Sequence, residues 1–163
     1  MKAIGIIAFA FGAPDTIQPN RRITEIASNK ARELNGRVYT QLDVRIEKGI
    51  PVEYTEEESG NPPPTLRIAR GAIQWAKRYR LTELWVVAAK PHLWRALRDV
   101  EKAILEDGAR IKVYVCKKIE QYPEDSWFCP DSTQDRVQSR EAWNRRENIL
   151  KLIPFFIYKR VAS

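Results

Sequence analysis

Residues 83–97 read Glu-Leu-Trp-Val-Val-Ala-Ala-Lys-Pro-His-Leu-Trp-Arg-Ala-Leu. After the first glutamate, residues 84–89 are all apolar, which is typical of a strand buried on both faces of a parallel sheet. From Pro91 onward the apolar residues recur at helical spacing, and proline is tolerated in the first turn of a helix. This stretch therefore predicts a buried strand over 83–89 that continues directly into a helix over 91–106, which is half of a βαβ unit.

The same alternation of apolar runs and amphipathic segments extends over most of the chain. Strands are predicted over residues 3–11, 37–42, 83–89 and 111–116, and helices over residues 20–34, 65–79, 91–106 and 137–152. This order predicts an α/β fold, a Rossmann-like three-layer sandwich with a mostly parallel central sheet. We expect strands 3–11 and 83–89 to be central and parallel.

Two of the predicted helices carry more detailed expectations. Asn20 is expected to cap the first helix, because asparagine is a favoured N-cap residue. The helix over 91–106 is expected to face the core with one apolar stripe. The stripe consists of Leu93, Leu97, Val100 and Ile104.

At 163 residues and 18.9 kDa, the chain has the size of a single domain. We assign its core to residues 1–116, and a C-terminal loop, helix and aromatic tail to residues 117–163. Residues 43–64 show no sustained period, and a loop of this length is usually functional or mobile. Cys116 and Cys129 belong to no CxxC pair, so we expect a buried, reduced Cys116 and a free Cys129.

Charge and hydropathy restrict the possible partners. The chain has 28 Lys and Arg against 21 Asp and Glu, and its net charge of +7 indicates an anionic partner. The longest apolar run, residues 3–13, is too short to span a bilayer, and no lipidation motif follows it. We therefore expect a cytoplasmic protein that does not contact a membrane. A single histidine and two cysteines thirteen residues apart do not suggest a metal site.

Three segments are expected to meet at the carboxyl ends of the strands. Open parallel sheets bind ligands there, and helix N-termini offer free N–H groups. The segments are residues 11–15, 60–65 and 89–95. Gly12, in the first of them, would let a ligand approach the backbone closely. The chain has neither a GxGxxG dinucleotide fingerprint nor a P-loop motif.

The third segment is the most informative, because it contains His92, the single histidine of the chain. His92, Arg95 and Asp99 are spaced three and four residues apart, so they share a helical face away from the apolar stripe. The imidazole could act in acid–base chemistry, while Lys90 and Arg95 could hold a phosphate or a carboxylate. The alternative is a helix-capping or solvated histidine beside an ordinary Arg95–Asp99 surface pair.

Residues 87–96, Val-Ala-Ala-Lys-Pro-His-Leu-Trp-Arg-Ala, resemble a pattern of the YdcF-like family, which includes SanA and ElyC. In that family a strand ends in Val-Thr-Ser and is followed, two residues later, by His-x-x-Arg-Ala. The resemblance covers residues 3–116, with further matches at Gly12, Arg21–Arg22, Asn61 and Thr65. It implies a Rossmann-like domain with a small anionic ligand, and it allows S-adenosylmethionine as a cofactor, since some members are associated with binding it.

These observations lead to two hypotheses from different classes. In the first, the protein binds a nucleotide-like or phosphorylated compound, with or without catalysis by His92. Its ligand-binding residues would then be Gly12, Asp15, Arg22, Thr65, Lys90 and Arg95. In the second, it is a nucleic-acid-associated or regulatory interaction protein that binds through surface arginines. These are Arg67, Arg70, Arg78 and Arg145–Arg146. The sequence leaves the substrate, the reaction and the oligomeric state open.

Overall fold

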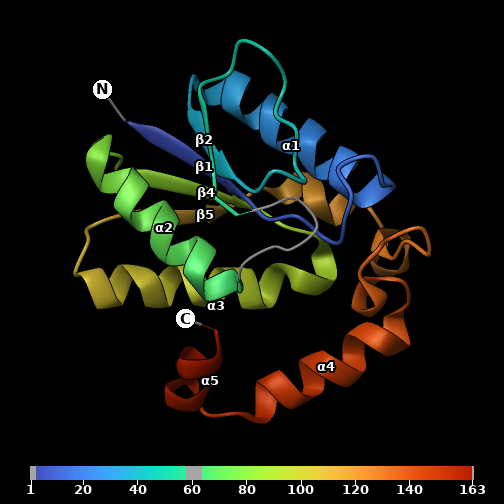
Figure 1. Cartoon of the computed structure of the whole chain (residues 1–163). Coiled ribbons are helices and arrows are strands. Elements are labelled where there is room, and N and C mark those ends of the chain that lie inside the picture. The colour runs from blue at the N-terminus through green and yellow to red at the C-terminus, as the bar shows by residue number, and fades with distance from the viewer. Residues whose placement is uncertain (1–2, 58–63, 163) are drawn as a thin grey trace.

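The structure is a computed structural model of the chain and describes residues 3–57 and 64–162. In this described part, five parallel strands form one sheet in the order β3-β2-β1-β4-β5. The strands are β1 (Ile4–Ala8), β2 (Arg37–Thr40), β3 (Val52–Tyr54), β4 (Glu83–Val87) and β5 (Lys112–Val115). Helices cover both faces of this sheet (Figure 1), so the predicted Rossmann-like three-layer sandwich is confirmed.

The central position of β1 and β4 follows from their composition. β1 lies between β2 and β4, and β4 lies between β1 and β5, as the apolar runs predict. Because successive side chains of a strand point to opposite faces, β1 contributes to two cores at once. Ile6 and Ala8 pack in the core under helix α1 (Gln18–Leu34), while Ile7 packs in the core under helices α2 (Thr65–Arg78) and α3 (Lys90–Asp107).

Two expectations for the first half of the chain are wrong. Helix α1 begins at Gln18, so Asn20 lies inside its first turn and does not cap it. The side chain of Asn20 instead holds the loop after β1: its Oδ1 accepts from Phe11 N–H, and its Nδ2 donates to the carbonyls of Gly12 and Pro14. In addition, the three-residue strand β3 lies within residues 43–64, where no strand was predicted, because three residues are too few to show a period.

The expected core stripe of α3 faces the core: Val100 is buried in it, and Leu93, Leu97 and Ile104 are half-buried and pack against it. The stripe does not describe the whole buried surface of the helix. The buried face of α3 consists of His92, Arg95, Ala96, Asp99, Val100 and Ala103. Three of these side chains are polar or charged, and they are buried because the C-terminal part of the chain covers them.

The chain after β5 forms three short 3-10 helices and then two α-helices. The 3-10 helices are η1 (Lys117–Gln121), η2 (Glu124–Trp127) and η3 (Asp135–Val137). Helix α4 (Arg140–Leu152) is capped by Ser139, whose side chain accepts from Ala142 N–H, and helix α5 (Phe155–Val161) follows it. We call α4 and α5 together the C-terminal cap.

Figure 1 shows the C-terminal cap folding back below α3, so that the end of the chain returns to the helical layer. Tyr158 and Ala162 of this region form a small apolar core with Leu66 at the start of α2. Cys116 and Cys129 are both buried and free. No helix in the described residues has the length and apolar character that crossing a membrane requires.

Candidate functional site

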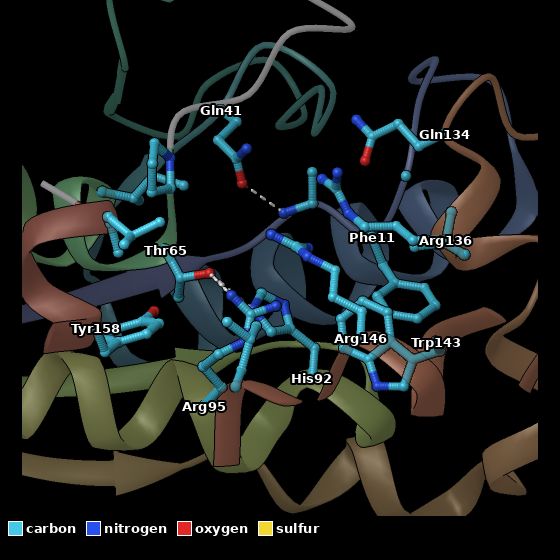
Figure 2. A pocket seen from close by; sticks show the side chains of 18 residues that line it. Phe11, Gln41, Thr65, His92, Arg95, Gln134, Arg136, Trp143, Arg146 and Tyr158 are labelled. Atoms are coloured by element: carbon cyan, nitrogen blue, oxygen red, sulfur yellow. Dashed lines mark hydrogen bonds between the residues drawn. The ribbon is translucent and has the colours of Figure 1, made fainter. Parts of the chain in front are cut away.

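A cavity of about 170 Å³ lies at the carboxyl ends of the strands, between the sheet and the C-terminal cap (Figure 2). The loops after β1 and β2 line it with residues 10–12 and Gln41, and the N-termini of α2 and α3 contribute Thr65, His92 and Arg95. The remaining walls come from η3 and from the C-terminal cap. Segments from both halves of the chain therefore build one site.

His92 is a buried, neutral side chain in this site. Its ring is enclosed by aromatic rings, with centroids 5.7 Å from Phe9, 6.5 Å from Phe11 and 5.7 Å from Trp143. Burial and then the positive charge of Arg95 hold the pKa of the imidazole well below its usual value of 6.5. His92 is therefore uncharged at pH 7, and its Nδ1 has no hydrogen-bond partner among the described residues.

A chain of hydrogen bonds joins His92 to the C-terminal cap. His92 Nε2 lies 3.1 Å from Thr65 Oγ1, and Arg95 Nη1 donates to the same oxygen at 2.8 Å. Arg95 Nε donates to Glu147 Oε1 at 2.7 Å, and the side chains of this ion pair are only 7% and 5% exposed. Since the donors of Arg95 serve Thr65 and Glu147, this arginine connects α3 to α2 and α4.

Asp99 makes a second buried connection to the C-terminal cap. Its Oδ2 accepts from the Tyr158 hydroxyl at 2.5 Å, and its Oδ1 accepts from Arg98 Nη2 at 2.8 Å. Burial, followed by the charge of Asp99, raises the pKa of Tyr158 to about 12. The alternative expectation of an Arg95–Asp99 surface pair is therefore wrong, because both side chains are buried and each has another ion-pair partner.

Arg136 and Arg146 give the cavity an excess of positive charge. Neither forms a hydrogen bond or an ion pair within the part of the chain that the structure describes. Burial and then the charges of Arg146 and Arg95 lower the pKa of Arg136 to about 10, and burial and Arg95 also lower that of Arg146. Both arginines remain protonated at pH 7, so the site is suited to an anion.

A further polar side chain lies at the same cavity. Gln134 lines the cavity, and its buried Nε2 has no hydrogen-bond partner among the described residues. Figure 2 shows Gln134, Arg136 and Trp143 on one side of the cavity, with Thr65 and Tyr158 on the other. An anion in the cavity would therefore meet guanidinium N–H donors from the C-terminal side, beside the Gln134 side chain.

The structure brings some of the predicted site residues together and separates others. Gly12, Thr65, His92 and Arg95 line the cavity. Asp15 forms an ion pair with Arg45 instead, and Lys90 is exposed and does not line the cavity. Arg22 donates to Ser126 Oγ at 3.1 Å and its guanidinium lies 4.0 Å from the Tyr122 ring centre, so it fixes the segment after β5. Gly60, in the second predicted segment, lies outside the described residues.

Gly12 lines the cavity, and its lack of a side chain has a structural role there. Its φ of 87° lies in the left-handed region, which favours glycine. A Cβ at this position would lie 2.6 Å from Ser132 Oγ and 2.6 Å from Val137 Cγ2. The absence of a side chain therefore allows the C-terminal segment, which carries Gln134 and Arg136, to pack against the loop after β1.

Sequence reasoning missed Gln134, Arg136, Trp143 and Tyr158 as site residues and assigned Arg146 to a nucleic-acid surface. Residues 117–136 have no periodicity from which a position in space could be inferred. A signal was available only for α4, where Trp143 and Glu147 are spaced four apart and form its buried face.

The other arginines of the nucleic-acid hypothesis are paired at the surface. Arg67, Arg70 and Arg78 each form an ion pair with a glutamate. The pairs are Arg67–Glu57, Arg70–Glu106 and Arg78–Glu53. Because carboxylates already neutralise these guanidinium groups, they do not form a continuous positive surface for a phosphate backbone.

Comparison with models of known protein families and with curated proteins finds no match for this chain.

Proposed function

We propose that the protein binds a small phosphorylated or nucleotide-like ligand, and holds the anionic group of that ligand in the cavity between the strand ends and the C-terminal cap. The observation that supports this most directly is the pair Arg136 and Arg146, two protonated guanidinium groups that line the cavity and form no ion pair within 4 Å in the described chain. Arg136 is half-buried, and a half-buried charge is costly unless it is paired, whereas Arg146 is solvent-exposed and adds positive charge at the same cavity. An anionic ligand would supply a partner to both.

The position of the cavity supports the same proposal. In doubly wound sheets, ligands bind beyond the carboxyl ends of the strands, where the strand order reverses. In the order β3-β2-β1-β4-β5 this point lies between β1 and β4, and the loop after β1 and the helix after β4 both line the cavity. The site thus coincides with the place where this fold class recognises small molecules.

The size and charge of the cavity limit what enters it. Pockets for drug-sized ligands measure about 300–1,000 Å³. A cavity of about 170 Å³ fits a phosphoryl or carboxylate group and the adjoining part of a molecule. Its positive charge is unfavourable for the sulfonium group of S-adenosylmethionine, so an anion is the better candidate.

Three earlier expectations belong to this proposal. His92 is the candidate for acid–base catalysis, although its Nε2 contacts Thr65 and its Nδ1 is buried, so we assign it first to positioning Thr65 and Arg95. We also propose that the chain belongs to the YdcF-like family, because His92 and Arg95 of the shared pattern line the same cavity. A cytoplasmic location, where phosphorylated metabolites are plentiful, completes the proposal.

Thermal unfolding with a panel of anions tests the proposal. The panel contains inorganic phosphate, glycerol phosphate, adenosine monophosphate and acetate, at matched ionic strength. A ligand at 100 times its Kd should stabilise the protein by about 2.7 kcal/mol and raise Tm by about 5–10 °C. No shift with any phosphorylated compound would contradict the proposal.

A matched pair of variants assigns the response to the cavity. Arg146→Gln should weaken binding about tenfold or more, because it removes a charge-assisted hydrogen bond. Arg145→Gln, next to it on α4, removes the same charge from a side chain that is also exposed but does not line the cavity, and should leave binding unchanged. Equal loss in both variants would point to general electrostatics and not to this site.

A further inference from the structure

We infer that the group held in this cavity is a dianion, the terminal phosphate of a phosphomonoester, and that Arg136 and Arg146 together select it over monoanions. This inference rests on the proposed function and narrows its ligand class. The evidence is the balance of charges around the cavity and the donors that remain without a partner there.

The other charged groups at the site have ion-pair partners, although Oε2 of Glu147 accepts no hydrogen bond from the described residues. Arg95 is paired with Glu147 at 2.7 Å, and both side chains are more than nine-tenths buried. Asp99, behind them, is matched by Arg98 and by the Tyr158 hydroxyl. Two unmatched positive charges therefore remain at the cavity, on Arg136 and Arg146.

Two adjacent guanidinium groups repel each other, and the ligand charge determines how much of this repulsion is removed. Arg136 and Arg146 line the same cavity (Figure 2), and the charge of Arg146 is, after burial, a cause of the lowered pKa of Arg136. A monoanion such as a phosphodiester or a carboxylate neutralises only one of them. A phosphomonoester carries about −1.5 to −2 at pH 7 and neutralises both.

The available donors also match a phosphate group. Each guanidinium presents a planar fork of N–H groups that suits two phosphate oxygens. The buried Nε2 of Gln134 lacks a partner in the described chain and can donate to a third oxygen. A carboxylate has only two oxygens and would leave one of these donors unused.

Calorimetric titration of the full chain with three anions tests the inference. Glycerol phosphate is a phosphomonoester, sulfate is a dianion at every pH used, and dimethyl phosphate is a monoanion. At pH 7.5, glycerol phosphate and sulfate should bind about tenfold or more tightly than dimethyl phosphate. In Arg136→Gln and in Arg146→Gln this preference should largely disappear, while Arg145→Gln should retain it.

The pH dependence distinguishes the ligand's charge from that of the protein. The second pKa of a phosphomonoester is about 6, so its affinity should fall by about tenfold per pH unit well below that value. The titratable and charged groups that face the site are His92 and Arg95 of α3, Arg146 and Glu147 of α4, Arg136 of η3 and Tyr158 of α5. Sulfate meets the same groups, so a flat sulfate curve between pH 5 and 8 assigns the change to the phosphate.

The outcomes separate the two proposals. If none of the anions binds, the proposed function is contradicted. If dimethyl phosphate binds as tightly as glycerol phosphate, or if sulfate and glycerol phosphate follow the same pH curve, the anion site stands and the selection of a dianionic monoester is wrong. Binding of sulfate without glycerol phosphate would contradict the monoester assignment alone.

Discussion

Replacing Glu147 by glutamine tests whether a buried ion pair holds the C-terminal cap to the core. Glu147 and Arg95 lie 2.7 Å apart with 5% and 7% of their side chains exposed. Glutamine retains an oxygen that accepts from Arg95 Nε but removes the negative charge. The variant therefore leaves the guanidinium of Arg95 buried and without a counter-charge.

The expected cost follows from this burial. Removing one partner of a buried ion pair costs about 3–5 kcal/mol, and we expect the lower end of this range because a hydrogen bond is retained. For a chain of this size, a loss of about 3 kcal/mol lowers Tm by roughly 6–12 °C. Glu106→Gln is the matched control, because the Arg70–Glu106 pair is 34% and 35% exposed. Its loss should cost about 1 kcal/mol or less.

Urea unfolding followed by circular dichroism measures both variants. The midpoint should fall clearly in Glu147→Gln and little in Glu106→Gln, with unchanged m-values if both variants unfold in two states. Glu147→Gln should also bind sulfate more tightly, since it adds a third uncompensated positive charge beside the cavity. Equal stability losses in the two variants would refute the conclusion that the buried Arg95–Glu147 ion pair holds the C-terminal cap to the core.

Three further predictions concern single residues. Gly12→Ala should destabilise the protein by about 2 kcal/mol or more in urea unfolding, because its Cβ would lie 2.6 Å from Ser132 Oγ. Gly49→Ala, also at positive φ but with open space around it, should cost only about 1 kcal/mol; equal losses would rule out the close contact as the cause. Tyr158 has a folded-state pKa of about 12 against 10 for a free phenol, so its stabilisation is complete below pH 10 and is lost as pH rises towards 12. The free energy of unfolding of the wild type should therefore fall by about 2 kcal/mol between pH 10 and pH 12 relative to that of Tyr158→Phe. If the two proteins gave parallel curves of stability against pH, this contribution of Tyr158 would be excluded. The NMR titration midpoint of His92, the single histidine, should lie well below 6.5, and its depressed pKa should reduce stability as pH falls below 6.5. A normal titration near 6.5 would show that the ring is solvated.

Local patterns in the sequence were sufficient to predict the layers of the fold. The runs over 3–11 and 84–89 are apolar without alternation, and only a strand covered on both faces buries all of those side chains. Their central, parallel positions follow from that requirement. The same reasoning located the ligand-binding edge, because the carboxyl ends of parallel strands lie together.

The same patterns did not predict the burial of the polar residues of α3, a helix that is covered on two sides. A helical stripe analysis assumes that polar residues face water, and it therefore placed His92, Arg95 and Asp99 outside the core. They are buried because partners distant in sequence satisfy their polar atoms. Arg95 reaches Glu147 over 52 residues, and Asp99 reaches Tyr158 over 59.

Periodicity and residue type alone thus establish a doubly wound sheet and place Gly12, Thr65 and His92 at one edge of it. The charge of the cavity arises only when the chain folds back, because Arg136 and Arg146 come from a segment without periodicity and from a helix that could have faced solvent. Short-range spacing determines which face of a strand or helix is apolar. Which distant side chains share a cavity, and which charges there lack a partner, depends on long-range packing that no local spacing contains.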